Sequence, residues 1–230
     1  MPKTDPATSE ETIDRFEVAT RFALPTDYRS LVVEFAGEGL LTGPGMVPLA
    51  VKIPSFYDPA TPDLVGYELS LLDLPAGGWV DRFLDFDGLV GVQAAGSPAQ
   101  AELIRRSPFL NEHRDWAVSL VPVFASHGVS ALGNLCFDFF DAAQLPPVVF
   151  VQKGMAMGPT DPNWEGIWYV AESVTAMLDP ANVEEFDYEA ESFPLDIKLD
   201  AGLDVSRVPT EAELLWNQRR DERLGRKPNR

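Results

Sequence analysis

The sequence predicts an α+β fold, with a largely antiparallel, mixed sheet and helices packed on one face of it. Four short runs rich in β-branched and aromatic residues follow one another between residues 116 and 171, with short turn-like gaps between them. Short gaps favour antiparallel pairing, because a parallel connection needs a crossover of a dozen or more residues. Helical periodicity precedes these runs and returns after them, an order typical of α+β proteins.

The chain opens with two predicted helices. We expect residues 1–7 to form a disordered leader. Thr8 and Glu11 then have the spacing of a capping box, which begins a helix that ends near Thr20. The second helix lies in the stretch LPTDYRSLVVEFAG, residues 24–37.

The sequence of this second helix contains signals for where it begins, which face is buried and where it ends. Pro25 suits the first turn, where its missing N–H would have no partner in any case. Gly37 is placed to adopt the left-handed conformation that ends many helices. Apolar residues between them recur with helical spacing, which predicts that they face the core: Tyr28, Leu31, Val32 and Phe35.

The middle of the chain has weaker signals. Alternating apolar residues over 47–53 predict a strand. Residues 54–97 are rich in proline, glycine and aspartate, and we interpret them as an insertion that forms extra strands or a surface excursion. Ser97 and the proline after it predict a short helix over about 98–107.

The sheet-forming runs are the clearest secondary-structure signal. Each combines β-branched and aromatic residues between turn residues, and we expect four adjacent antiparallel strands at 116–125, 132–140, 147–153 and 166–171. Ser173 precedes the sequence VTAML and predicts a short capped helix.

The C-terminal part follows the predicted sheet. Residues 181–208 are acidic, and Thr210 and Glu213 then form a capping box for a helix that ends near Leu224, with Gly225 as its stop. We therefore divide the chain into the leader, a single domain at 8–180 with its insertion, and an acidic segment plus helix at 181–230.

The charge balance limits the partners of this protein. The chain has 36 acids against 18 bases, a net charge of −18. The last sixteen residues hold six bases and two acids, so the rest of the chain carries −22. Such a body repels nucleic acids and anionic membranes and attracts a basic partner. The alternative is that the charge serves solubility alone.

The composition favours a cytoplasmic protein. The N-terminus has no apolar run of the kind found in a secretory signal, and no stretch approaches the roughly 18 apolar residues of a membrane helix. Cys136 is the only cysteine, so no internal disulfide is possible, which fits a reducing compartment.

Signals of nucleophilic or phosphate chemistry are weak. The glycine-rich stretch at 37–45 follows a helix, whereas a phosphate cradle follows a strand, so we interpret it as a loop. His127 and Ser130 lie in a predicted turn with no nucleophile elbow around the serine. Cys136 lies within a strand and is expected to be a buried, inert thiol. A hydrolase built on Ser130, His127 and an aspartate is the catalytic alternative.

Acidic clusters give no stronger indication of a site. Glu112, His113 and Asp115 are ligand types without the paired spacing of a metal site, and we expect neither a metal nor another cofactor. Asp138 and Asp141 lie near the end of one strand. Without a sequence signal for a pocket, we expect both carboxylates to be solvated.

Several stretches together resemble the SUKH superfamily, which contains the Smi/Knr cell-wall regulators of yeast and many bacterial immunity proteins. LPTDYRSLVVEFAG resembles its early helix and the following glycine. LVPVFASHG, GNLCFDFFD and PVVFV resemble its successive strands, and VAESVTAML resembles its closing serine-capped helix, with Val174 where the family usually has phenylalanine. The likeness covers about residues 8–53 and 98–180.

The resemblance implies a binding module and not an enzyme. It leads us to expect a bacterial immunity protein that neutralises a toxin, and the negative charge fits a basic target such as a nuclease. A regulatory or scaffold protein of the Smi/Knr type is the alternative, and the oligomeric state is left open. From the charge and the aromatic residues we expect partner contacts, or else a solubilising strip, at Glu184, Glu185, Phe186, Asp187, Tyr188, Glu189 and Glu191.

Overall fold

The computed structural model describes residues 10–35, 49–57, 78–86, 88–89, 101, 105, 107–125, 133–141, 145–152, 166–179, 183–185 and 208–225. The expected leader, Thr8, Gly37 and the glycine-rich loop 37–45 lie outside these ranges. His127, Ser130 and most of the segment 54–97 also lie outside them.

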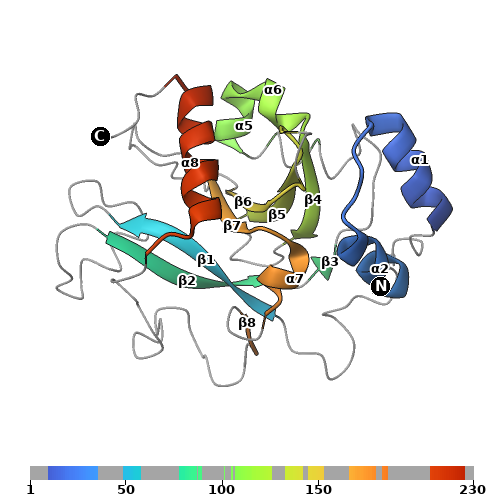
Figure 1. Ribbon diagram of the computed structural model, residues 1–230, viewed down its shortest axis with the longest axis horizontal. Helices are drawn as coiled ribbons and strands as arrows, with labels where there is room; N and C mark the ends of the chain where they lie inside the picture. The colour runs from blue at the N-terminus through green and yellow to red at the C-terminus, as the bar shows by residue number, and fades with distance from the viewer. Residues whose placement is uncertain are drawn as a thin grey trace.

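A five-stranded sheet lies at the centre of the described chain (Figure 1). Its strands have the spatial order β3-β4-β5-β6-β7, and every pairing is antiparallel. The last four strands are the four predicted runs, so their adjacency and the α+β class are confirmed. The mixed pairing that we allowed for does not occur among the described strands. The bounds are β3 (Gly88–Leu89), β4 (Leu120–Ala125), β5 (Gly133–Asp138), β6 (Val148–Gln152) and β7 (Ile167–Ala171).

A second, three-stranded sheet uses residues from distant parts of the sequence. Its central strand β1 (Leu49–Tyr57) pairs antiparallel with β2 (Gly78–Phe86) and with β8 (Val183–Glu185). β1 also contacts β7. The predicted strand at 47–53 is therefore present and extends to Tyr57, and the segment 54–97 does contain extra strands.

One face of the five-stranded sheet is covered by α1 (Glu10–Thr20), α2 (Thr26–Phe35) and α7 (Val174–Met177). Tyr28 is fully buried there, and its ring meets Phe137 of β5 edge to face at 5.0 Å. The carboxylate of Asp27 accepts hydrogen bonds from the backbone and the hydroxyl of Thr175, which tie α2 to α7. The predicted core role of Tyr28 is confirmed.

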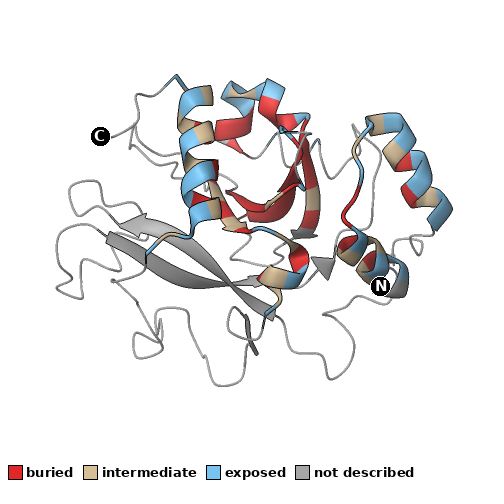
Figure 2. Ribbon diagram, viewed as in Figure 1, coloured by how far each residue is buried: buried red, intermediate tan, exposed pale blue. Residues whose placement is uncertain are grey.

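The other face is covered as well, so the prediction of helices on one face was wrong. α5 (Pro108–Glu112), α6 (Arg114–Ala117) and α8 (Glu211–Arg223) pack on it through a second apolar cluster that includes Trp116, Cys136 and Trp216. Figure 2 shows buried residues along the strands and on the inward sides of these helices. The reason is that Leu135, Cys136 and Phe137 follow one another in β5 and point to alternate faces of the sheet, so both faces are apolar and require cover.

Part of the first sheet-forming run is also helical, contrary to the prediction. Trp116 and Ala117 lie in α6, and β4 begins only at Leu120. The carbonyl oxygen of His113 accepts hydrogen bonds from the backbone N–H groups of Trp116 and Ala117, at 3.0 and 3.2 Å. Bulky residues have β propensity, but local hydrogen bonding and tertiary packing outweigh it here.

The predicted helix caps at Ser173 and Thr210 are present. The hydroxyl of Ser173 accepts from the backbone N–H of Ala176, and that of Thr210 accepts from Glu213. Gly225 follows α8 with a φ of 68°, in the left-handed region expected of a stop residue. Within the described residues, no helix is long and apolar enough to cross a membrane.

Candidate functional site

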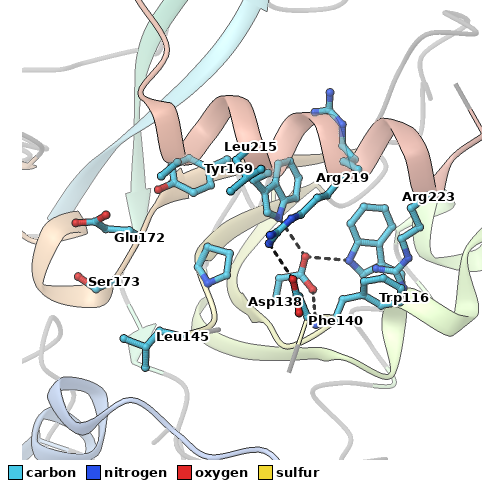
Figure 3. A pocket seen from close by; sticks show the side chains of 15 residues that line it. Trp116, Asp138, Phe140, Leu145, Tyr169, Glu172, Ser173, Leu215, Arg219 and Arg223 are labelled. Carbon is cyan, nitrogen blue, oxygen red and sulfur yellow. Dashed lines mark hydrogen bonds and ion pairs between the residues drawn. The ribbon is translucent and has the colours of Figure 1, made fainter. Parts of the chain in front are cut away.

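A pocket of about 660 Å³ lies between α8 and the strand ends of the five-stranded sheet (Figure 3). Its residues come from α6, from the ends of β5 and β7, from the segment before β6, and from one side of α8. The lining combines aromatic rings with charged groups. The aromatic residues are Trp116, Phe140, Tyr169 and Trp216, and the charged ones are Asp138, Asp141, Glu172, Arg219, Arg220 and Arg223.

Asp138 connects three elements at the floor of this pocket. It is the last residue of β5 and is only 6% exposed. Its Oδ2 accepts the indole N–H of Trp116 from α6 and that of Trp216 from α8, both at 3.2 Å. Its Oδ1 accepts the backbone N–H of Phe140 at 3.1 Å. One carboxylate therefore joins the sheet to two helices that lie far apart in the sequence.

The expectation that Asp138 and Asp141 are both solvated was wrong for Asp138. Burial raises the pKa of Asp138, while its hydrogen bonds with Phe140, Trp216 and Trp116 and the charge of Arg223 act in the opposite direction. Asp141 is partly exposed and forms a 2.8 Å ion pair with Arg219. No local pattern around Asp138 indicates its burial, because the two indoles come from residues 22 and 78 positions away.

Arginines on one side of α8 form the basic part of the pocket. Arg219 pairs with Asp141, and the guanidinium of Arg220 lies 3.2 Å from Asp221. Arg219, Arg220 and Arg223 follow Trp216 by three, four and seven positions, which is helical spacing. This spacing is visible in the sequence, and it is the signal from which the basic side of the pocket could have been predicted.

Arg223 occupies an unusual position among them. Its guanidinium carbon lies 4.0 Å from the centre of the Trp116 ring and 2.9 Å from that of Phe140, and those centres are 6.3 Å apart. The charge is therefore held between two aromatic rings. Burial lowers the pKa of Arg223 to about 10, although the charges of Asp138 and Asp115 oppose that shift.

Of the candidate residues singled out from sequence, Asp138 and Asp141 line the pocket, whereas the other described candidates do not. Cys136 is fully buried in β5, as expected. His113 packs its ring against Phe109 at 4.7 Å, and Glu112 beside it is exposed. In the described part of the chain, no three His, Cys, Asp or Glu side chains are grouped to hold a metal ion.

The proposed contact segment is only partly within the described residues. Glu184 and Glu185 lie on β8, opposite Ala50 and Leu49 of β1. The other five residues, from Phe186 to Glu191, lie outside the described ranges. The order β2-β1-β8 makes β8 an outer strand of the described three-stranded sheet, and none of its residues lines the pocket.

Comparison of the chain with protein-family models, with curated proteins and with solved structures found no match. The candidate site therefore rests on its own geometry.

Removing the Asp138 carboxylate tests its connecting role. Asp138→Ala leaves two indole N–H groups and one backbone N–H without their acceptor, and we expect a loss of about 2–3 kcal/mol in the free energy of unfolding. Urea denaturation followed by circular dichroism measures this loss. Asp141→Ala removes only a partly exposed ion pair and should cost less than about 1 kcal/mol. Equal losses in both variants would contradict the connecting role.

The raised pKa of Asp138 also predicts a pH dependence. The folded pKa lies above the ordinary value of 3.8, so the folded protein binds more protons than the unfolded chain in the window between those two values. The contribution of Asp138 to stability therefore falls as the pH rises through that window. The amide of Asp138→Asn cannot titrate. As the pH rises through that window, the free energy of unfolding of the wild type should therefore fall relative to that of Asp138→Asn. A stability difference between the two proteins that does not change with pH would contradict the raised pKa of Asp138.

Proposed function

We propose that this chain is a non-catalytic protein-binding module, and specifically a bacterial immunity protein that binds and neutralises a basic toxin domain. The observation that carries the proposal is the surplus of negative charge. Even if each of the 18 bases paired with a different acid, half of the 36 acids would still have no basic partner within the chain. Complementary charge on a partner accelerates association and suppresses wrong partners.

Several of the described bases form ion pairs within the chain, and such pairing leaves the net charge of −18 unchanged. Arg29 alone forms ion pairs with Glu10, Asp14 and Glu17 at 2.8–2.9 Å. Hydrogen bonds with Asp14, Glu17 and Glu10, in that order, raise the pKa of Arg29. The bases of α8 make similar contacts with neighbouring acids. These arginines are therefore already paired and do not neutralise the rest of the acidic surface.

A nuclease toxin is a suitable partner class, because a protein that acts on a polyanion presents a basic face. The resemblance to SUKH proteins supports the same proposal, since many bacterial members of that superfamily are immunity proteins. We place the contact at the outer strand β8 and the segment that follows it, which carries five acids and two aromatic residues at positions 184–191. Aromatic residues at the centre of such a patch commonly supply much of the binding energy.

A regulatory or scaffold protein of the Smi/Knr type is the second candidate, favoured by the same resemblance. The gene next to the one that encodes this chain distinguishes the immunity role from the regulatory role. A neighbouring reading frame that ends in a small basic domain favours immunity, whereas its absence favours the regulatory role.

Charge neutralisation tests the proposed contact segment. We expect the replacement of Glu184, Glu185, Asp187, Glu189 and Glu191 by their amides to slow association with the neighbouring toxin domain about tenfold at low ionic strength. Near 500 mM salt the difference should largely vanish, because the Debye length falls to a few ångströms, about 4 Å. Stopped-flow fluorescence at both salt concentrations measures this.

A matched control separates contact from overall charge. It removes the same number of negative charges at exposed carboxylates elsewhere, namely Glu11, Glu112, Asp179, Glu211 and Glu222. If both variants slow association equally, the segment is not the contact and the field of the whole protein is responsible. If the segment variant associates at the wild-type rate at low salt, the segment lies outside the interface.

A further inference from the structure

The guanidinium of Arg223 is buried without a hydrogen-bond acceptor among the residues that the structure describes. Its side chain is 10% exposed, and none of its three nitrogens has a hydrogen-bond partner among the described residues. The Asp115 carboxylate forms an ion pair with it at 3.8 Å, beyond hydrogen-bonding distance. Burying a charged group without acceptors is unfavourable, and the ring contacts with Trp116 and Phe140 offset this only in part.

Asp138, another nearby acid, does not supply the missing acceptor in this arrangement. Its two oxygens already accept three N–H groups, from Trp116, Trp216 and Phe140. Arg223 therefore interacts electrostatically with Asp138 but makes no hydrogen bond with it. The group that completes this site must bring its own acceptor oxygens, and a carboxylate matches the fork of a guanidinium best.

We propose that the pocket binds a small organic carboxylate with an aromatic or branched apolar body, whose carboxylate group pairs with Arg223. This proposal is independent of the toxin partner. The pocket volume of about 660 Å³ suits a molecule of this kind. Tyr169, Leu215 and Trp216 provide the apolar wall for its body.

The distribution of charge in the pocket orients the ligand. Figure 3 shows Arg223 at one end, beside Trp116 and Phe140, and Glu172 with Ser173 at the opposite end. A carboxylate placed at the Glu172 end would meet a like charge, whereas at the Arg223 end it meets a guanidinium whose nitrogens have no hydrogen-bond acceptor among the described residues. The apolar body then lies along the pocket between the two ends.

Phe140 acts as a cover over the anion site. Its ring packs on the guanidinium of Arg223, yet the residue is 54% exposed. Because more than half of Phe140 is exposed, its ring can turn outward into solvent, and this movement opens the guanidinium to the pocket. Phe140 thus shields the cation when the pocket is empty and admits the carboxylate when a ligand enters.

The direct test compares two probes of the same shape on the wild-type protein. Isothermal titration calorimetry near neutral pH should show phenylbutyrate binding about tenfold or more tightly than phenylbutyramide, which lacks the negative charge. Equal affinities, or no binding of phenylbutyrate at millimolar concentration, would overturn the proposal. This comparison does not depend on the folding of any variant.

Three variants test whether Arg223 causes the preference for phenylbutyrate over phenylbutyramide. Arg223→Gln should abolish the preference for the acid over the amide. Arg15→Gln removes an exposed arginine of α1 and should leave the preference unchanged. Phe140→Ala should preserve or strengthen binding of phenylbutyrate, because it removes the cover. A preference that survives in folded Arg223→Gln, or that disappears in Arg15→Gln, would refute the assignment to Arg223, and a loss of binding in Phe140→Ala would refute the covering role.

Discussion

Replacing Trp216 with alanine is expected to lower the free energy of unfolding by about 3–5 kcal/mol, the usual loss for a buried large aromatic residue. Trp216 is 8% exposed and is the only buried apolar residue of α8. Its ring lies 6.2 Å from that of Trp116 and 6.3 Å from that of Tyr169, and its indole N–H donates to Asp138. The substitution thus removes the main attachment of α8 to the sheet together with one hydrogen bond.

Urea denaturation followed by circular dichroism measures this loss, and two further variants control it. Trp216→Phe keeps a ring but not the N–H donor, and should cost about 1–2 kcal/mol. Leu214→Ala removes a residue of the same helix that is 55% exposed, and should change stability by less than about 1 kcal/mol. A loss in Trp216→Ala no larger than that in Leu214→Ala would mean that α8 is not docked on the sheet.

The second large effect is expected at Gly133. A Cβ atom there would lie 2.5 Å from the ring carbons of Phe150, and closer still to the backbone carbonyl oxygen of Val151. Gly133 pairs with Gln152 on β6, so the neighbouring backbone cannot move without disturbing the ladder. We expect Gly133→Ala to cost about 3 kcal/mol, at the upper end of the range for overpacked sites.

Gly225 offers a control of a different kind. It has a φ of 68°, but a Cβ there would meet no described residue within 4 Å, so we expect Gly225→Ala to carry only the cost of the left-handed backbone, about 1 kcal/mol. Thermal unfolding followed by circular dichroism compares the two variants. If Gly133→Ala proved as mild as Gly225→Ala, the close packing of β5 on β6 would be wrong.

The elements that were predicted correctly have local signals in the sequence. The caps at Ser173 and Thr210 depend on residues three positions apart, and the core role of Tyr28 follows from helical spacing. The four runs of the sheet combine composition with short gaps, which act over a few residues. These features do not depend on how distant parts of the chain meet.

The elements that were not predicted depend on contacts between distant residues. Nothing near Asp138 in the sequence reveals that indoles 22 and 78 positions away enclose it. The packing of helices on the second face was missed for the same reason. The helix at 211–223 was predicted, but not that it packs on the sheet, and Trp116 was predicted to lie in a strand whereas it lies in α6. The unsatisfied state of Arg223 is a property of three-dimensional packing alone.

The most direct test of the proposed function is a titration of this chain against the basic toxin domain encoded beside it, with the activity of that domain as the readout. The proposal predicts a tight complex that abolishes the toxin activity, with an association rate that falls steeply as salt rises from ~50 to ~500 mM. No complex at micromolar concentration and low salt, with the toxin activity unchanged, would contradict the assignment as an immunity protein.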